Sequence, residues 1–109
     1  MPVTKFSEWS AAPDPVTKRK RKVWFSMAEV AEVPFAFAGI WRRADGPDGP
    51  EMRMAFLTTM ANSLVASVHP KAMPVILHRQ DYSRWLEGST ADAVALATAY
   101  PSEKMVVLD

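Results

Sequence analysis

Hydrophobic and polar residues alternate over several short stretches of the chain, a spacing typical of β-strands with one buried face. Over residues 23–27, Val23, Phe25 and Met27 share one face of a predicted strand. Further short strands are predicted over residues 2–9, 35–41, 51–59, 75–77 and 105–108. Nine prolines and four glycines separate these elements, which disfavours a helical bundle.

The strongest turn signal lies at residues 44–50, which read Ala-Asp-Gly-Pro-Asp-Gly-Pro. It predicts that the two strands on either side pair as a β-hairpin. If the alternation is kept, the returning strand buries Met54 and Phe56. Gly39, in the strand before the turn, is expected to mark a bend or a close approach of the backbone.

Two helices are predicted near the C-terminus. Aromatic and leucine side chains form one stripe over residues 80–87, and Gly88 ends that helix. Ser89 or Thr90 caps a second, alanine-rich helix, which ends before Pro101. The C-terminal part of the chain therefore adds helices to a chain that is otherwise built of strands.

The composition narrows the class of protein. The chain has 109 residues, of which 49% are hydrophobic, so one small domain is expected. Its net charge of +1 predicts a weak electrostatic field around the whole molecule. It has no cysteine, which excludes a disulfide, a thiolate metal site and a thiol nucleophile. With only His69 and His78 as imidazole ligands, no metal or cofactor is predicted. No apolar run is long enough to cross a bilayer and no signal-peptide pattern is present, so a cytoplasmic protein is expected.

Five consecutive cations stand between the first two predicted strands: Lys18, Arg19, Lys20, Arg21 and Lys22. Such a run can bind the phosphates of a nucleic acid. It is also typical of a solvated hairpin loop, or of an edge strand protected against aggregation. Trp24 and Trp41 can stack on bases, but core packing is the preferred interpretation for both.

His69 is the first candidate for chemistry. It lies on a proline-stiffened loop that leads into the short strand over residues 75–77, where an imidazole can be held as a general acid or base. From the residues alone, an ordinary surface histidine is the favoured interpretation.

Two other polar residues are candidates. Glu8 stands beside Trp9 at a strand end, where it can shuttle protons or simply be solvated. Asn62 can hold a carbonyl or phosphate of a substrate, or it can cap a helix. The segment that follows it, residues 62–68, is too short to assign and is compatible with one helical turn.

Four motifs resemble those of the SOS-response-associated peptidase (SRAP) family, in the family's order. Residues 2–9 resemble its Pro-Ala-Asp-Gly-Phe-Tyr-Glu-Trp strand, and residues 35–41 its Phe-Ala-Phe-Ala-Gly-Leu-Trp strand. Residues 58–62 resemble its Thr-Thr-x-Ala-Asn segment. Val68-His69, with Met-Pro-Val-Ile-Leu at 73–77, resembles its Ile-His-x-Arg-Met-Pro-Val-Ile-Leu. The match extends over nearly the whole chain, down to a Trp-Leu pair in the predicted helix, and is therefore specific.

The resemblance implies a function and assigns roles. SRAP proteins recognise abasic sites in single-stranded DNA and crosslink to them through the α-amine and thiol of an N-terminal cysteine. By resemblance, the catalytic glutamate of the family corresponds to Glu8 and its catalytic histidine to His69. Lys71 falls where the family has a phosphate-binding arginine, provided that the two sequences are aligned on the histidine.

The chain also departs from the family. The family's cysteine and an Asn-Ala-Arg segment lie upstream of the strand that resembles residues 2–9. Ser7 replaces the tyrosine of that strand, and one extra residue separates His69 from the Met-Pro pair. We therefore expect a C-terminal SRAP fragment, a truncated paralogue or one half of a split protein.

Together these observations predict a single partial SRAP-like domain over residues 1–109. Its expected fold is α+β, with a curved, mainly antiparallel sheet and two short C-terminal helices. The leading expectation is a DNA-damage-response protein that binds single-stranded DNA through Asn62, Lys71 and the basic run, and cannot crosslink by itself. The alternative is a non-catalytic remnant that binds nucleic acid or a partner chain, either an N-terminal segment or a second copy. A peptidase is a weaker third choice, because no Ser-His-Asp or Cys-His arrangement is visible.

Overall fold

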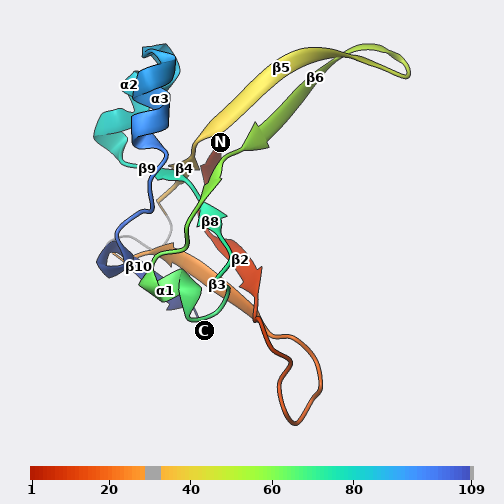
Figure 1. The fold of residues 1–109 in the computed structure, drawn as a ribbon, viewed down its shortest axis with the longest axis vertical. Coiled ribbons are helices and arrows are strands. Elements are labelled where there is room, and N and C mark those ends of the chain that lie inside the picture. The colour runs from red at the N-terminus through yellow and green to blue at the C-terminus, as the bar shows by residue number, and fades with distance from the viewer. Residues whose placement is uncertain (29–32, 109) are drawn as a thin grey trace.

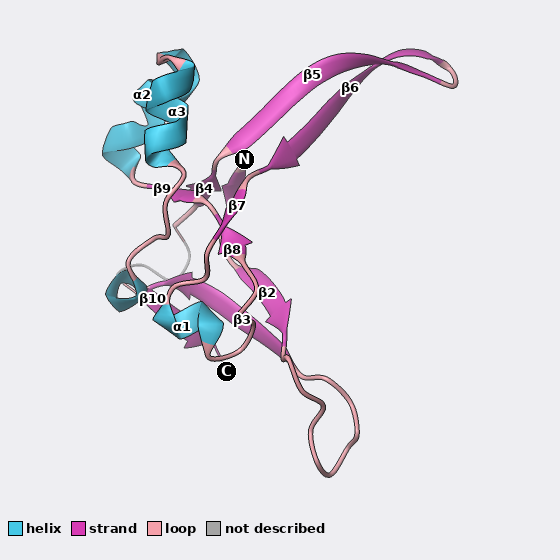
Figure 2. Ribbon diagram, viewed as in Figure 1, coloured by secondary structure: helices cyan, strands magenta, loops and turns pink. Residues whose placement is uncertain are grey.

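The computed structural model describes residues 1–28 and 33–108, which form an α+β fold of short elements (Figures 1 and 2). In chain order these are β1 (Pro2–Val3), β2 (Phe6–Trp9), β3 (Lys22–Met27), β4 (Phe35–Phe37), β5 (Gly39–Gly46), β6 (Gly49–Phe56), β7 (Thr58–Thr59), α1 (Ser63–Ala66), β8 (Met73–Pro74), β9 (Ile76–Leu77), α2 (Tyr82–Glu87), α3 (Thr90–Leu96) and β10 (Met105–Leu108). Single 3₁₀ turns precede α2 (Arg79–Asp81) and β10 (Ser102–Lys104). None of the helices within this described part is long and apolar enough to cross a membrane.

All strand pairs in the described residues are antiparallel, as predicted, but they do not form one curved sheet. They form four small sheets with the strand orders β10-β3-β2, β1-β4-β9, β5-β6 and β7-β8. The two C-terminal helices are confirmed as α2 and α3, and α1 is a third short helix. Gly88 follows α2, and Ser89 caps α3 through a reciprocal pair of hydrogen bonds with Asp92.

The predicted strands over 35–41 and 51–59 are each interrupted once. The breaks fall at Ala38 and Leu57, where the backbone turns toward another segment. Ala38 N–H donates to Val75 O at 2.9 Å, Leu57 N–H to Ala38 O at 3.0 Å and Val75 N–H to Leu57 O at 2.9 Å. This three-way junction uses the backbone groups that would otherwise extend each ladder, and Gly39 follows it at the expected bend.

A core of aromatic and aliphatic side chains lies between the two three-stranded sheets. Its buried members are Phe6, Val23, Phe25, Phe35, Phe37, Val65, Met73, Ile76 and Met105. Phe6 stacks on Phe25 with ring centroids 5.3 Å apart. A second cluster joins the junction to the helices, because Val75 and Leu77 pack against Tyr82 and Trp85. The predicted burial of residues 75–77 is thus confirmed.

The predicted hairpin is confirmed, but its predicted burial is wrong. Strands β5 and β6 pair from Gly39↔Phe56 to Gly46↔Gly49, and Gly49 has the positive φ of 112° that favours glycine. Met54 is 70% exposed, and Phe56 is exposed as well. The preferred core packing of Trp24 and Trp41 is also wrong, because both rings are exposed.

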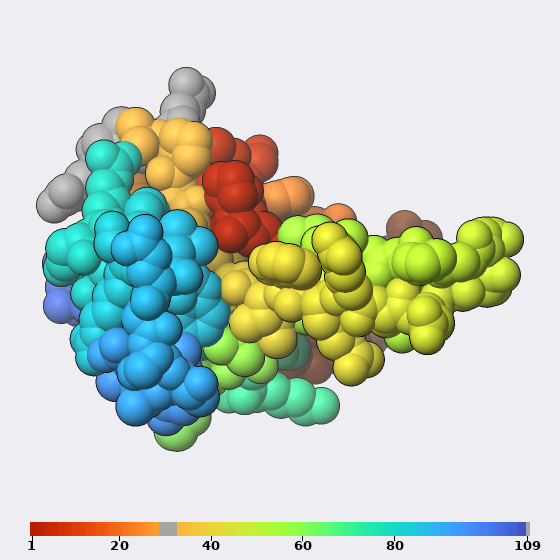
Figure 3. All heavy atoms as spheres, turned by 90° about the horizontal axis from the view of Figure 1, so that it is seen from above, coloured from red at the N-terminus to blue at the C-terminus, as the bar shows by residue number. Residues whose placement is uncertain are grey.

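For Trp41, Met54 and Phe56, the cause of this exposure is the position of the hairpin. It projects beyond the rest of the molecule, as the yellow-to-green strands in Figure 3 show. The radius of gyration, 16.1 Å, accordingly exceeds the roughly 13 Å of a compact domain of this size. Alternation alone predicts two faces of a strand, but burial needs a layer to cover one of them.

Candidate functional site

Glu8 and His69 are brought to the same place by two different segments. Glu8 lies in β2, paired with Val23 of β3, and its side chain is half-buried. His69 follows α1, and its backbone N–H donates to Val65 O at 2.7 Å. The neighbouring Val68 O accepts a 3.0 Å hydrogen bond from Ala11 N–H, which fastens the histidine segment to the end of β2.

The two side chains face one another. His69 Nε2 is 3.9 Å from Glu8 Oε2, and the side chains are 29% and 24% exposed, respectively. This separation is too long for a direct hydrogen bond but short enough for an ion pair when the imidazole is protonated. Because the resemblance assigns Glu8 and His69 to one catalytic site, it implies that they lie close together, and the structure brings them together. The catalytic roles of the pair stay a prediction.

The pair lines a cavity of about 270 Å³. Its walls are Phe6, Ser7, Glu8, Phe37, Phe56, Thr58, His69, Ala72, Met73 and Pro74. A few polar groups thus stand among apolar walls, an arrangement common in sites that bind small polar groups. The sequence did not indicate Phe56 or Thr58 as site residues, although Thr58 lies in the segment 58–62 that carried part of the resemblance.

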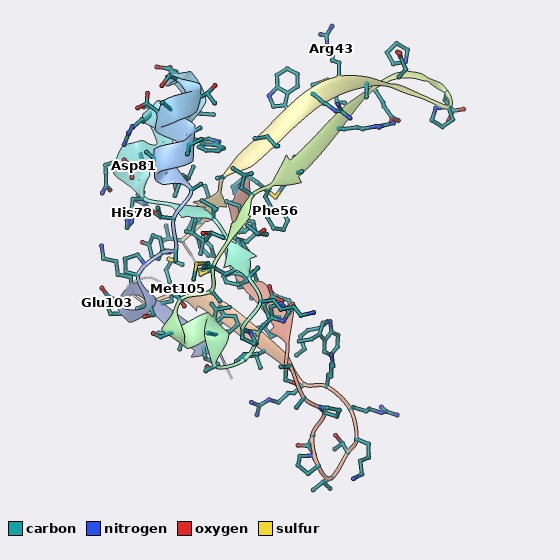
Figure 4. The ribbon with its side chains drawn as sticks, in the orientation of Figure 1. Arg43, Phe56, His78, Asp81, Glu103 and Met105 are labelled. Atoms are coloured by element: carbon teal, nitrogen blue, oxygen red, sulfur yellow. The ribbon has the colours of Figure 1, made fainter. Side chains whose placement is uncertain are left out.

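The base of the β5–β6 hairpin contributes to this cavity. Phe56 is the last residue of β6, and its ring centroid lies 5.0 Å from that of Phe37, which also lines the cavity. Figure 4 shows Phe56 at the root of the hairpin and Arg43 farther out along β5. One wall of the cavity therefore continues into the exposed hairpin.

The basic run lies on the loop between β2 and β3 and ends at Lys22, the first residue of β3, which pairs with Trp9. The loop is folded around Asp14, whose carboxylate accepts hydrogen bonds from Val16 N–H at 2.8 Å and Thr17 N–H at 2.9 Å. These bonds, that from Thr17 first, lower the pKa of Asp14 below its usual value of 3.8. The five cations, Lys18 to Lys22, are all exposed, and Lys22 Nζ lies 4.9 Å from the Trp9 ring centroid.

Asn62 and Lys71 do not line the cavity. Asn62 Oδ1 accepts from Val65 N–H at 3.0 Å, and Asn62 Nδ2 donates to Tyr100 O at 2.6 Å. The helix-cap interpretation of Asn62 is thus confirmed, and its binding of DNA stays a prediction. Lys71 is exposed two residues after His69, and its role is likewise a prediction.

Two further features bear on the choice of site. A cavity of about 330 Å³, lined in part by His78, Arg79, Tyr82 and Tyr100, includes none of the predicted site residues. Within residues 1–28 and 33–108, no group of three or more His, Cys, Asp or Glu side chains is arranged to hold a metal ion. The Glu8–His69 cavity is therefore where the predicted chemistry and the geometry coincide.

Comparison with known proteins extends this result. Abasic site processing protein YoqW of Bacillus subtilis (strain 168) is 31% identical to this chain over 93 residues, which make up 84% of this chain and 39% of YoqW. YoqW of Bacillus phage SPbeta matches to the same extent.

Two crystal structures share the fold over 98% of this chain at 25% identity. One, a protein from Bacteroides thetaiotaomicron, has a TM-score of 0.82, with 46% of its chain covered. The other, from Bordetella bronchiseptica, has a TM-score of 0.79, with 51% covered. The chain thus spans about half, or less, of the length of these relatives. The family described as SOS response associated peptidase (SRAP) matches residues 1–109, and the chain belongs to this family.

Proposed function

We propose that this chain supplies the proton-transfer pair and part of the DNA-binding surface of an SRAP protein that acts at abasic sites in single-stranded DNA. The observation that carries the proposal is the approach of His69 Nε2 to Glu8 Oε2, 3.9 Å apart in a partly apolar cavity. The name of the relative YoqW, an abasic site processing protein, supports the same substrate class.

The chemistry needs proton transfer at two stages. When an amine attacks the aldehyde carbon of the ring-opened sugar, its nitrogen gives up a proton and the former carbonyl oxygen takes one up, which forms the carbinolamine. The carbinolamine hydroxyl then takes up a second proton and leaves as water, which produces a protonated imine that releases the remaining proton. Glu8 and His69 can serve as the acceptor and the donor for these steps, because a positioned carboxylate can act as a general base and an imidazole as a general acid or base.

The DNA strand is held, in this proposal, by the cations on either side of Glu8 and His69. The loop that follows β2 carries Lys18 to Arg21, Lys22 begins β3, and Lys71 follows His69 by two residues. Cations placed in this way neutralise phosphates without reading the bases. Binding should therefore be independent of sequence and sensitive to salt.

This chain alone lacks one reactant of the family reaction. A stable thiazolidine needs a thiol and an amine on adjacent carbons, and the chain has no cysteine. Its own α-amine can form only an imine, which hydrolyses. In this proposal the thiol and the amine come from residues outside these 109.

A denaturing gel with an oligonucleotide containing an abasic site tests the proposal. We expect no lasting crosslink with the chain alone, and a crosslink when a family N-terminal segment beginning with cysteine is joined to it. In the joined protein, Glu8→Gln and His69→Ala should each slow crosslinking about 100-fold or more. Glu103→Gln and His78→Ala are matched controls outside the cavity and should leave the rate unchanged. A stable band from the chain alone would refute the thiol requirement.

A second function, binding without chemistry, is favoured by the exposed apolar surface of the β5–β6 hairpin. In that case the chain binds nucleic acid or a partner chain, and Glu8 and His69 are only structural. The same gel separates the two functions, because a joined protein that crosslinks at an equal rate with and without both substitutions would leave only the binding role.

A further inference from the structure

The cavity of about 330 Å³ beside α2 is separate from the cavity of Glu8 and His69. Its walls come from segments far apart in the sequence: the end of β3, the start of β4, the turn into α2 and the segment before β10. Among the described residues, the two cavities share no lining residue. Figure 4 shows His78 of this cavity and Phe56 of the other on opposite sides of the ribbon. The molecule therefore has a second site to explain.

Four ring side chains line this cavity: Phe35, His78, Tyr82 and Tyr100. The His78 ring stacks on the Tyr100 ring, with centroids 4.6 Å apart and an angle of 28° between the planes. Phe35, at the start of β4, is buried in the aromatic core, which fixes its ring. Rings held in this way present flat surfaces on which a planar group can stack. The cavity is therefore suited to an aromatic ligand.

Two cations line the same cavity. Arg79 and Lys104 are both exposed, and neither forms an ion pair within residues 1–28 and 33–108. Asp81 and Glu103 are close to them in sequence, but no described lining residue carries a carboxylate. A guanidinium and an ammonium without acidic partners attract an anion, and the arginine fork matches the oxygens of a phosphate.

The size of the cavity limits the ligand. Its volume lies at the lower end of the roughly 300–1,000 Å³ found for small-molecule sites. We propose that it binds a nucleoside monophosphate, with the base against the rings and the phosphate between Arg79 and Lys104. A free nucleotide and the 5′-phosphorylated end of a DNA strand present this same chemistry. The inference does not rest on the proposed function, because no residue of this cavity takes part in the proton transfers.

Calorimetric titration of the chain with AMP tests the proposal. Two fragments of AMP separate the contributions of its halves, since adenosine lacks the phosphate and ribose 5-phosphate lacks the base. We expect AMP to bind and each fragment to bind about 10-fold or more weakly, because a charge-assisted contact and a stacked base each contribute to affinity. Inorganic phosphate should bind more weakly still.

A pair of substitutions locates the phosphate. Arg79→Ser with Lys104→Ser should weaken AMP binding about 10-fold or more. Both residues are exposed, so thermal melts followed by circular dichroism should be unchanged. Arg42→Ser with Arg43→Ser removes two exposed cations of the β5–β6 hairpin and is the matched control, for which AMP binding should stay within about twofold.

NMR spectra of the chain locate the ligand independently of the variants. Addition of AMP should shift the amide signals of Arg79 and Lys104 and leave those of Glu8 and His69 in place. An oligonucleotide with a 5′-phosphate, compared with the same strand without it, distinguishes the two sources. If only the phosphorylated strand competes with AMP, the cavity takes strand ends as well as free nucleotides; if neither competes, it takes free nucleotides alone.

Four results would overturn the proposal. The chain could show no binding at millimolar AMP, or the two pairs of substitutions could weaken binding equally. Inorganic phosphate could bind as tightly as AMP, which would leave an anion site with no place for a base. The unphosphorylated strand could compete as well as the phosphorylated one, which would show that a terminal phosphate is not what the cavity recognises.

Discussion

Two extensions project from opposite ends of the molecule, and they differ in almost every property (Figure 1). The β2–β3 loop, with the first residue of β3, carries five consecutive cations, and the loop folds around the Asp14 carboxylate. The β5–β6 hairpin carries no net charge and exposes a tryptophan, two methionines and a phenylalanine. The two extensions therefore expose different chemistry: cations, which attract a phosphate backbone, and apolar side chains, which are typical of a contact with a polypeptide.

The largest expected effect is on stability, and it compares a buried residue of β3, the strand after the cationic loop, with an exposed residue of the hairpin. Phe25 in β3 is 0% exposed and stacks on Phe6, so Phe25→Ala should lower the free energy of unfolding by about 3–5 kcal/mol. Trp41→Ala in β5 should change it by about 0.5 kcal/mol or less, because the ring is exposed. Urea unfolding of both variants measures the difference. Equal destabilisation would show that the hairpin is covered in solution.

The next effect concerns DNA and salt. If Lys18 to Lys22 each neutralise one phosphate, affinity for single-stranded DNA should fall on the order of 100-fold between about 50 and 200 mM salt. Replacing these five residues with serine should remove most of the binding and flatten the salt dependence, as measured by filter binding. Replacing Arg42, Arg43 and Arg53 with serine is the control and should have a small effect. If the loop and the hairpin substitutions lower the affinity for DNA to a similar extent, the two extensions do not differ in DNA binding.

The smallest effect is a pH dependence confined to the loop. The pKa of Asp14 is lowered in the folded chain, so its contribution to loop order is complete above pH 3.8 and is lost as the pH falls through the lowered pKa. The amide signals of Val16 and Thr17 should report this loss in an NMR titration. Asp14→Asn should abolish the transition and Asp48→Asn, in the hairpin turn, should not. A loop whose amides do not respond to acid would contradict the role of Asp14.

The sequence predicted the local elements of this fold better than their assembly. Alternation and turn residues identified β3, the β5–β6 hairpin and the helix ends, because each depends on neighbours in sequence. The breaks at Ala38 and Leu57 depend on hydrogen bonds to residues about twenty to forty positions away, which no local pattern contains. The exposure of Met54 and Trp41 depends on the absence of a covering layer, which alternation does not describe.

The candidate site, like the fold, could be predicted from the sequence only where it depends on neighbouring residues. The residues alone favoured a surface histidine at position 69, and only the resemblance paired His69 with Glu8. Their approach depends on the Ala11–Val68 hydrogen bond and on the pairing of β2 with β3. The cap made by Asn62 was a local possibility from the start, since asparagine before a short helix is a common N-cap.

The central proposal is that the cationic run, and not the β5–β6 hairpin, binds single-stranded DNA, and one paired measurement tests it most directly. The affinity for single-stranded DNA would be measured with the serine variant of Lys18 to Lys22 and with a Trp41→Ser, Met54→Ser variant. The account predicts that the first variant loses most of the binding and that the second keeps it. If the hairpin variant loses DNA as strongly as the first variant while remaining folded, the assignment of DNA binding to the cationic run is wrong.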